Sequence, residues 1–354
     1  MNNHIVTLAD KLAETHRLTH NEYKTIIEEH DREDAEYLAH LALAQKQSIY
    51  GDDIFIRGLI EISNYCKNDC LYCGIRRSNK NCARYRLTDE EILECCHEGY
   101  ELGFRTFVMQ GGEDTNFDDL RLCNLIVKIK SDHPDCAVTL SLGERSCDSY
   151  RHLKEAGADR YLLRHESATM KHYNKLHPSD MSWDNRIKSL FDLRRLGYQV
   201  GCGFMVNSPY QTTDMLATEL DFISEFKPDM CGIGPFIPHR DTPLGVHPSG
   251  SVELTCLLIS CIRLIYPRVL LPATTALGTL HSQGREMGIL AGANVVMPNL
   301  SPASVRKKYM LYDNKLSDGA ESAQSMDTLA KRMEAIACRI AVGRGDIIKE
   351  KEGM

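Results

Sequence analysis

The sequence lacks the features that would place the protein in a membrane or on a nucleic acid. No stretch reaches the roughly 18 uninterrupted apolar residues that a membrane-spanning helix needs. Basic side chains are not in excess, because 42 Lys and Arg face 49 Asp and Glu and leave a net charge of −7. We therefore expect no attraction to nucleic acid or to an anionic membrane. The opening residues MNNHIVTLADKLAETH form an amphipathic pattern without the apolar centre of a signal peptide, which predicts a cytoplasmic protein.

Low-complexity linkers are also missing, so nothing in the sequence divides the chain into separate domains. Eight short β-rich segments alternate with helix patterns, at 54–63, 105–110, 137–143, 160–166, 198–206, 230–237, 268–275 and 294–299. Such alternation is typical of a parallel sheet, and eight strands close a (β/α)8 barrel of about 250 residues. The sequence predicts an α/β fold, a (β/α)8 TIM-type barrel at 51–300. We expect an N-terminal helical extension at 1–50 and a C-terminal loop and helix at 301–354, with one amphipathic helix over 325–343.

Three cysteines stand apart from the other eleven by their spacing. Cys66, Cys70 and Cys73 form a C-x3-C-x2-C array directly after the first β-rich segment, where the chemistry of such a barrel lies. The remaining thiols are scattered through apparent helices and strands, as packing residues of a reduced intracellular chain would be. A structural zinc site is one alternative, with Cys82 as a fourth ligand. A 4Fe–4S cluster held by three thiolates instead leaves one iron open for a substrate or cofactor.

The C-x3-C-x2-C loop, with Tyr72 before its last cysteine, resembles the defining motif of the radical S-adenosylmethionine (SAM) superfamily. In that superfamily the open iron chelates SAM, and an electron from the reduced cluster cleaves it to a 5′-deoxyadenosyl radical. The stretch QGGED at 110–114 ends the second β-rich segment, where the superfamily has a Gly-Gly-Glu stretch for the methionine amino group. A plain turn after a strand is the alternative for two glycines alone.

Longer stretches resemble one family, the HydE-type maturases of FeFe-hydrogenase. They are SLGE (141–144), GADRYLLRHE (157–166), GIGPFIPHRDTPL (232–244), PATTALGT (272–279) and GREMGILAGANVVMPNLSP (284–302). The resemblance implies that Cys66, Cys70 and Cys73 bind the cluster, and that SAM is contacted by Tyr72, Gln110, Gly111, Gly112, Glu113, Ser141, Arg164, Glu166 and Met230. It places Arg160, Thr274, Thr275 and Tyr309 around an inner cavity for small anions. From the pattern alone, a strand-end salt-bridge network at 160–166 and simple packing of the two threonines stay open.

The resemblance implies a function in building the di-iron subsite of the hydrogenase H-cluster. The expected substrate is small and anionic or organometallic, an iron–cysteine carbonyl/cyanide precursor, and the expected partners are an electron donor and other hydrogenase maturation proteins. One cluster is expected, because 300–354 holds a single cysteine, Cys338. Two alternatives remain open, namely a biotin-synthase-like or methylornithine-synthase-like radical SAM enzyme acting on a small organic substrate, and a zinc-stabilised scaffold without chemistry.

Overall fold

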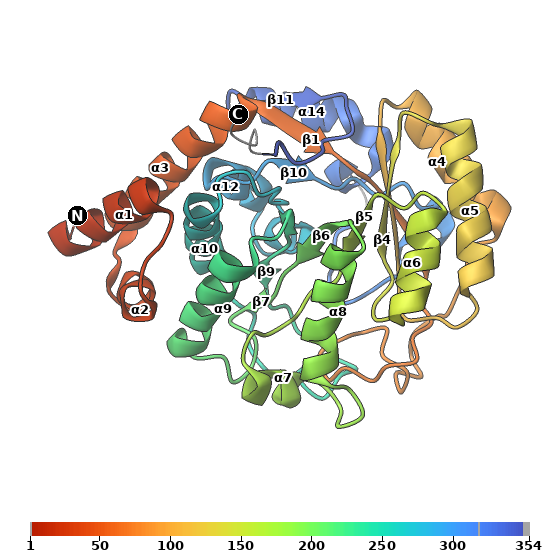
Figure 1. The fold of residues 1–354 in the computed structure, drawn as a ribbon, viewed down its shortest axis with the longest axis horizontal. Coiled ribbons are helices and arrows are strands. Elements are labelled where there is room, and N and C mark those ends of the chain that lie inside the picture. Colours follow the sequence, from red (N-terminus) through yellow and green to blue (C-terminus); the bar gives the residue numbers. More distant parts are fainter. Residues whose placement is uncertain (1, 318, 350–354) are drawn as a thin grey trace.

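A closed ring of parallel strands lies at the centre of the computed structural model, which describes residues 2–317 and 319–349 (Figure 1). Six strands form one sheet in the order β2 (Gly58–Ser63), β3 (Thr106–Gly111), β4 (Ala137–Ser141), β5 (Arg160–Leu162), β6 (Gln199–Cys202) and β8 (Met230–Cys231). Single parallel β-bridges complete the ring. They pair Met230 with Leu270, Pro272 with Val295, and Asn299 with Leu59. The predicted barrel is therefore confirmed.

The first and last parts of this ring differ from the prediction. The segment 54–63 is not one strand but two, β1 (Asp53–Ile56) and β2, divided at Arg57. β1 pairs with β10 (Val295–Val296) on one side and with β11 (Arg339–Ala341) on the other. A further two-stranded ladder, β7 (Met205–Val206) with β9 (Gly234–Pro235), follows β6 and β8 along the chain.

Helices surround the barrel and follow most of its strands. They are α1 (Asn3–Thr15), α2 (His20–Glu29), α3 (Arg32–Tyr50), α4 (Asp89–Glu101), α5 (Asp119–Asp132), α6 (Cys147–Glu155), α7 (Met170–Leu176), α8 (Trp183–Arg195), α9 (Thr213–Phe226), α10 (Val252–Ile265), α11 (Thr275–Leu280), α12 (Gly284–Leu290), α13 (Ala303–Arg306) and α14 (Met326–Glu334), with 3-10 turns at Gly319–Glu321 and Ala323–Ser325. α4 begins at a reciprocal capping box formed by Thr88 and Glu91. Among the described residues, no helix is both long and apolar enough to cross a membrane.

The three N-terminal helices pack on one side of the barrel (Figure 1). α3 lies against α10, and α2 lies against α9. Their inner faces carry fully buried apolar residues, including Ile26, Leu38 and Ala42. The spacing of these residues follows the helical period, so each helix buries one stripe and exposes the rest.

The C-terminal segment corrects a second expectation. The helix predicted over 325–343 ends at Glu334, and Ala337 then adopts a left-handed backbone with φ +56° that no helix continues through. The chain next forms β11 and crosses the amino-terminal end of the barrel. There the Arg344 carbonyl accepts a hydrogen bond from Thr106 Oγ1 at 2.8 Å, and Asp346 Oδ1 accepts one from Gln199 Nε2 at 2.7 Å. Residues 344–347 thus plug the end of the barrel opposite the strand ends that carry the chemistry.

Candidate active site

The cysteine loop, defined as residues 64–88 between β2 and α4, is held by hydrogen bonds to the backbone. Asn64 Nδ2 donates to the carbonyls of Ala83 and Lys308 at 2.9 and 2.8 Å, which fixes the start of the loop. The thiol of Cys66 accepts a hydrogen bond from the Glu113 amide at 3.3 Å. These contacts place all three motif cysteines on the wall of one cavity.

The three thiols fit an iron–sulfur cluster by their chemistry. Burial raises the pKa of Cys73 to about 12, and the neighbouring Cys66 adds to the shift. Burial, together with the other two thiols, also raises the pKa of Cys70 well above its ordinary value. Thiols in such surroundings become thiolates only when a metal supplies positive charge, and soft thiolates suit iron–sulfur clusters. Among the described residues, no three His, Cys, Asp or Glu side chains converge closely enough to hold a single ion.

The cavity has a volume of about 330 Å³ and lies at the carboxyl ends of the barrel strands. Of the sixteen site residues expected from the sequence, those that line it are Cys66, Cys70, Tyr72, Cys73, Gln110, Gly111, Gly112, Glu113, Ser141, Arg164, Glu166, Thr274, Thr275 and Tyr309. They come from the cysteine loop, from the ends of β3, β4 and β5, and from the later crossovers. The structure therefore brings distant parts of the chain together around one cavity.

Gly112, directly after β3, has a packing role that the sequence did not reveal. A Cβ atom on Gly112 would lie 2.2 Å from the Tyr65 carbonyl oxygen and 2.7 Å from Cys66 Cβ. Only glycine therefore lets the end of β3 touch the cysteine loop at this position. The adjacent Glu113 carboxylate is anchored by Lys67 Nζ at 3.0 Å and by the Glu144 amide at 3.0 Å.

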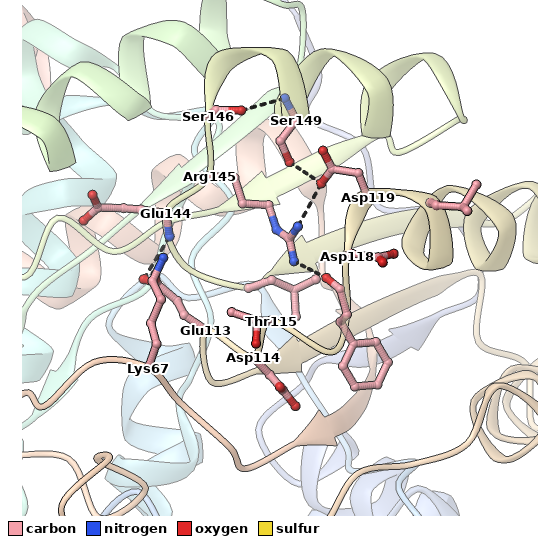
Figure 2. Close-up of a pocket in the computed structure, with 13 residues that line it drawn as sticks. Lys67, Glu113, Asp114, Thr115, Asp118, Asp119, Glu144, Arg145, Ser146 and Ser149 are labelled. Atoms are coloured by element: carbon pink, nitrogen blue, oxygen red, sulfur yellow. Dashed lines mark hydrogen bonds and ion pairs between the residues drawn. The ribbon is translucent and has the colours of Figure 1, made fainter.

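An open groove of about 550 Å³ lies beside the cavity, and Glu113 lines both (Figure 2). Figure 2 shows Lys67 reaching toward Glu113, and Arg145 turned toward Asp119. Arg145 Nη1 donates to Asp119 Oδ1 at 3.0 Å, and the Ser149 hydroxyl donates to the same oxygen at 2.5 Å. Arg145, Ser149 and Asp119 therefore bind one another along the wall of this open groove.

Three polar residues follow β5, namely Arg164, His165 and Glu166. Hydrogen bonds hold the His165 ring in place. His165 is fully buried, accepts from the Gly203 amide at Nδ1, and donates from Nε2 to Glu219 at 2.7 Å. Glu166 has a left-handed backbone with φ +63°, a strained state for a residue with a side chain. Arg164 Nη2 and Glu166 Oε2 lie 3.3 Å apart, yet each lacks a well-formed hydrogen bond within the described part of the chain. Buried polar groups of this kind indicate a bound ligand.

A second polar region lies where the later crossovers line the cavity. Thr275 Oγ1 donates to Glu321 at 2.9 Å, whereas the buried Thr274 hydroxyl has no hydrogen-bond partner in the described residues. Lys315 lines the cavity and pairs with the fully buried Glu61 at 2.6 Å. Its ammonium also lies 5.3 Å from the centre of the Tyr309 ring.

Two expected site residues lie elsewhere, which corrects their placement. Arg160 is fully buried at the start of β5, and its guanidinium donates to Asp346 at 2.6 Å and to the Arg344 carbonyl at 2.6 Å. It therefore anchors the C-terminal plug at the amino-terminal end of the barrel. Met230 is buried at the start of β8, where its sulfur accepts from Arg57 Nη1 at 2.8 Å. Both side chains lie toward the amino-terminal end of the barrel, because each residue is the first of its strand and not the last.

Sequence reasoning missed three polar residues of the site. Lys315 lies in an irregular segment whose charge pattern carries no signal of burial. Glu61 sits in a strand that reads as apolar, although its period-two position relative to Leu59 places it on the inner face. Arg186 lines the cavity from α8, where its guanidinium pairs with Glu144 and donates to the Arg164 carbonyl.

Comparison with known proteins places this geometry in a family. A profile of the Radical SAM superfamily matches residues 60–223. The chain is 42% identical over 323 residues to the [FeFe] hydrogenase maturase subunit HydE of Thermotoga maritima, covering 91% of this chain and 92% of that protein. It is 29% identical to 3-methylornithine synthase of Methanosarcina barkeri, over 95% and 94% of the two chains.

The fold agrees with a solved relative. The crystal structure of methylornithine synthase (PylB) superposes with a TM-score of 0.83, at 28% identity, covering 94% of this chain and 97% of that one. The cysteine loop, the cavity and these similarities together identify the family of this chain. The chain is an enzyme of the radical SAM superfamily, which binds a 4Fe–4S cluster and SAM, and within that superfamily it is closely related to the HydE maturase.

Proposed function

We propose that this enzyme cleaves SAM reductively and uses the resulting radical in assembling the di-iron subsite of the FeFe-hydrogenase H-cluster. Its substrate would be a small anionic or organometallic compound, an iron–cysteine carbonyl/cyanide precursor. The observation that carries this proposal is one cavity whose wall includes both the three motif thiols and a separate group of threonine, tyrosine and lysine side chains. The 42% identity to the Thermotoga maritima maturase supports the same function.

Different side chains would bind the cofactors and the substrate. The bound cluster, when reduced, supplies the electron that splits the sulfonium of SAM into methionine and a 5′-deoxyadenosyl radical. Cys66, Cys70 and Cys73 would hold that cluster. Arg164 offers a bidentate fork for the methionine carboxylate, and Glu166 accepts hydrogen bonds from the ribose hydroxyls.

The rest of the cavity wall would position the substrate and exclude water. Thr274 offers a hydroxyl that has no partner among the described residues and is suited to a small anion, and Lys315, paired with Glu61, lies on the same cavity wall. Tyr72 and Tyr309 close the wall, and burial raises the pKa of both phenols so that they stay neutral. Partners would be an electron donor and the other maturation proteins that receive the product, all in the cytoplasm.

The test is SAM cleavage by the anaerobically reconstituted and reduced protein, followed by hydrogenase maturation in vitro with the remaining maturases. We expect 5′-deoxyadenosine and active hydrogenase from the native chain, and neither from Cys70→Ala. Native enzyme that makes 5′-deoxyadenosine but leaves the hydrogenase inactive would contradict the maturase assignment.

A second candidate follows from the methylornithine synthase structure, which shares the fold over nearly the whole chain. In that case the cavity would take a small amino acid in place of the metal complex. The same reconstituted enzyme incubated with lysine and SAM distinguishes the two, because conversion of lysine to a branched isomer would favour this candidate over the maturase.

A further inference from the structure

The chain carries its positive charge unevenly. Two short segments, 64–86 and 306–315, hold ten basic residues and two acidic ones, in a protein whose net charge is −7. The basic residues are Lys67, Arg76, Arg77, Lys80, Arg84, Arg86, Arg306, Lys307, Lys308 and Lys315, and the acidic ones are Asp69 and Asp313. The first segment is most of the cysteine loop. Carboxylates from other segments also lie beside it, because Lys67 pairs with Glu113, Arg86 pairs with Asp114, and Asn81 donates to Asp241.

Hydrogen bonds hold the two segments side by side. Asn64, two residues before the first cluster ligand, donates to the Lys308 carbonyl at 2.8 Å. The Gly74 amide, directly after the last ligand, donates to the Leu311 carbonyl at 2.8 Å. Arg84 ties the loop to itself by donating to the carbonyls of Arg76 and Asn79. The two segments thus present one continuous face of the molecule.

Not all of these charges face the solvent. Arg76 pairs with Asp69 at 2.6 Å, and Lys315 is used inside the cavity. Four basic residues do lie exposed, and we call Arg77, Lys80, Lys307 and Lys308 the basic surface. Arg77, Lys80 and Lys308 form no ion pair with any carboxylate of the described residues, in contrast to Arg240 nearby, which binds Asp313. Their charges are therefore available to a partner.

We propose that the basic surface is the docking site of an acidic one-electron carrier protein that reduces the cluster. This inference rests on the proposed function, in which each SAM cleavage consumes an electron. The surface lies on the loop that holds the cluster ligands, so a carrier bound there would stand next to the acceptor. Clustered charge of one sign steers an oppositely charged protein to its site and raises the association rate by about 10- to 1,000-fold. Interfaces for electron transfer are small and weak, so the three cations Arg77, Lys80 and Lys308 form a sufficient footprint.

The experiment compares two ways of reducing the reconstituted enzyme. One is a small acidic ferredoxin, kept reduced, and the other is photoreduced deazariboflavin, an uncharged small molecule. The variant is Arg77→Glu/Lys80→Glu/Lys308→Glu, and the readout is the rate of 5′-deoxyadenosine formation at several salt concentrations. The matched control, Arg17→Glu/Lys24→Glu/Arg32→Glu, makes the same charge change on α2, on α3 and in the connection between α1 and α2, away from the cysteine loop (Figure 1).

We expect the ferredoxin-driven rate at low salt to fall about tenfold or more in the variant, and to lose most of its salt dependence. The control should keep the native rate, and all three proteins should react equally with deazariboflavin. Equal ferredoxin rates in variant and control would overturn the docking site. A variant that also fails with deazariboflavin would be replaced by Lys80→Gln alone, for which an unchanged ferredoxin rate overturns the inference. A native enzyme that cleaves no SAM with either reductant overturns the proposed function, and the docking site with it.

Discussion

Glu166 combines a strained backbone with a carboxylate that the protein leaves short of hydrogen bonds. Strain persists in a folded protein only when the surroundings impose it, and here the buried His165–Glu219 pair supplies that constraint. The neighbouring side chains of the cavity are therefore presented in one fixed orientation. At the scale of single residues, this pre-organisation makes the effect of small changes predictable.

Replacing Glu166 by Gln keeps the size of the side chain and removes its charge. We expect SAM binding to weaken about tenfold or more, because a hydrogen bond to a charged acceptor contributes about 1.5–3 kcal/mol. Cluster content should not change. Binding is measured by isothermal titration of the reconstituted enzyme, with Glu253→Gln at the exposed start of α10 as the control. Unchanged affinity would remove Glu166 from the cofactor site.

Replacing Lys315 by Met leaves the Glu61 carboxylate buried without its cation. The side chains are 7% and 0% exposed, so we expect unfolding in urea to be easier by about 3–5 kcal/mol. The double variant Glu61→Gln/Lys315→Met should recover most of that loss, since it leaves no uncompensated charge. Lys188→Met removes an exposed lysine from Asp192, which Arg195 still binds, and should cost less than about 1 kcal/mol. If the single and double variants are equally destabilised, Glu61 and Lys315 are not energetically coupled.

At the scale of elements, the end of β3 and the cysteine loop are fitted to each other at Gly112. The substitution Gly112→Ala puts a methyl group into the space of the Tyr65 carbonyl and the Cys66 Cβ, so the loop must move. We expect iron and sulfide content after reconstitution to fall severalfold, as measured by chemical analysis and by the visible absorption of the cluster. Gly343→Ala is the control, because a Cβ there meets no atom within 4 Å. Normal iron content in Gly112→Ala would show that the loop adapts.

The C-terminal plug joins β5, β6 and the tail through the Asp346 carboxylate. Burial alone would raise the pKa of Asp346, but the hydrogen bond from Arg344 and the charge of Arg160 outweigh it and hold the pKa well below its usual range. A depressed carboxyl pKa stabilises the fold above the ordinary aspartate pKa of about 3.9, and this contribution is lost as the pH falls toward the folded-state pKa.

We therefore expect Asp346→Asn to lower the free energy of unfolding by about 1–2 kcal/mol at pH 7, an amount reduced by the partial exposure of the carboxylate. The difference from the native protein should shrink steadily below about pH 4, as followed by urea unfolding across pH. Asp132→Asn, with the same exposure in a surface pair, should show little effect at either pH. A difference that stays constant down to pH 2 would exclude the carboxylate as its origin.

At the scale of the whole molecule, the N-terminal helices complete the surface of the barrel. Removing residues 1–50 would uncover the faces of α9 and α10 that α2 and α3 now cover, and with them an apolar patch of the kind that causes aggregation. We expect the shortened protein to elute as aggregates in gel filtration and to bind a hydrophobic dye. A monomeric, cluster-loading product would show that the helices are dispensable.

Sequence periodicity predicted the barrel because its strands bury both faces and alternate with capped helices. It could not predict the division at Arg57 or the strand β11, since both depend on pairing between segments almost 300 residues apart. For the site, the thiol spacing and the strand-end rule located the cavity, because both depend on local order. Arg160 was misplaced because the resemblance assigned it to the inner cavity, and only the tertiary contact with Asp346 shows which end of the barrel it faces.

The pairing of β1 with β11 also determines when the barrel can be completed during synthesis. Asp53 in β1 and Arg339 in β11 are neighbours in the folded protein, yet 286 residues separate them. At ribosomal rates of about 5–20 residues per second, the first strand waits roughly 15–60 s for its partner. During that interval the C-terminal segment does not yet cover the amino-terminal end of the barrel, and chaperones have time to act on it. A ribosome pause at any point between β1 and β11 would therefore lengthen the vulnerable period by its own duration, whereas a pause in α1, α2 or α3 would not.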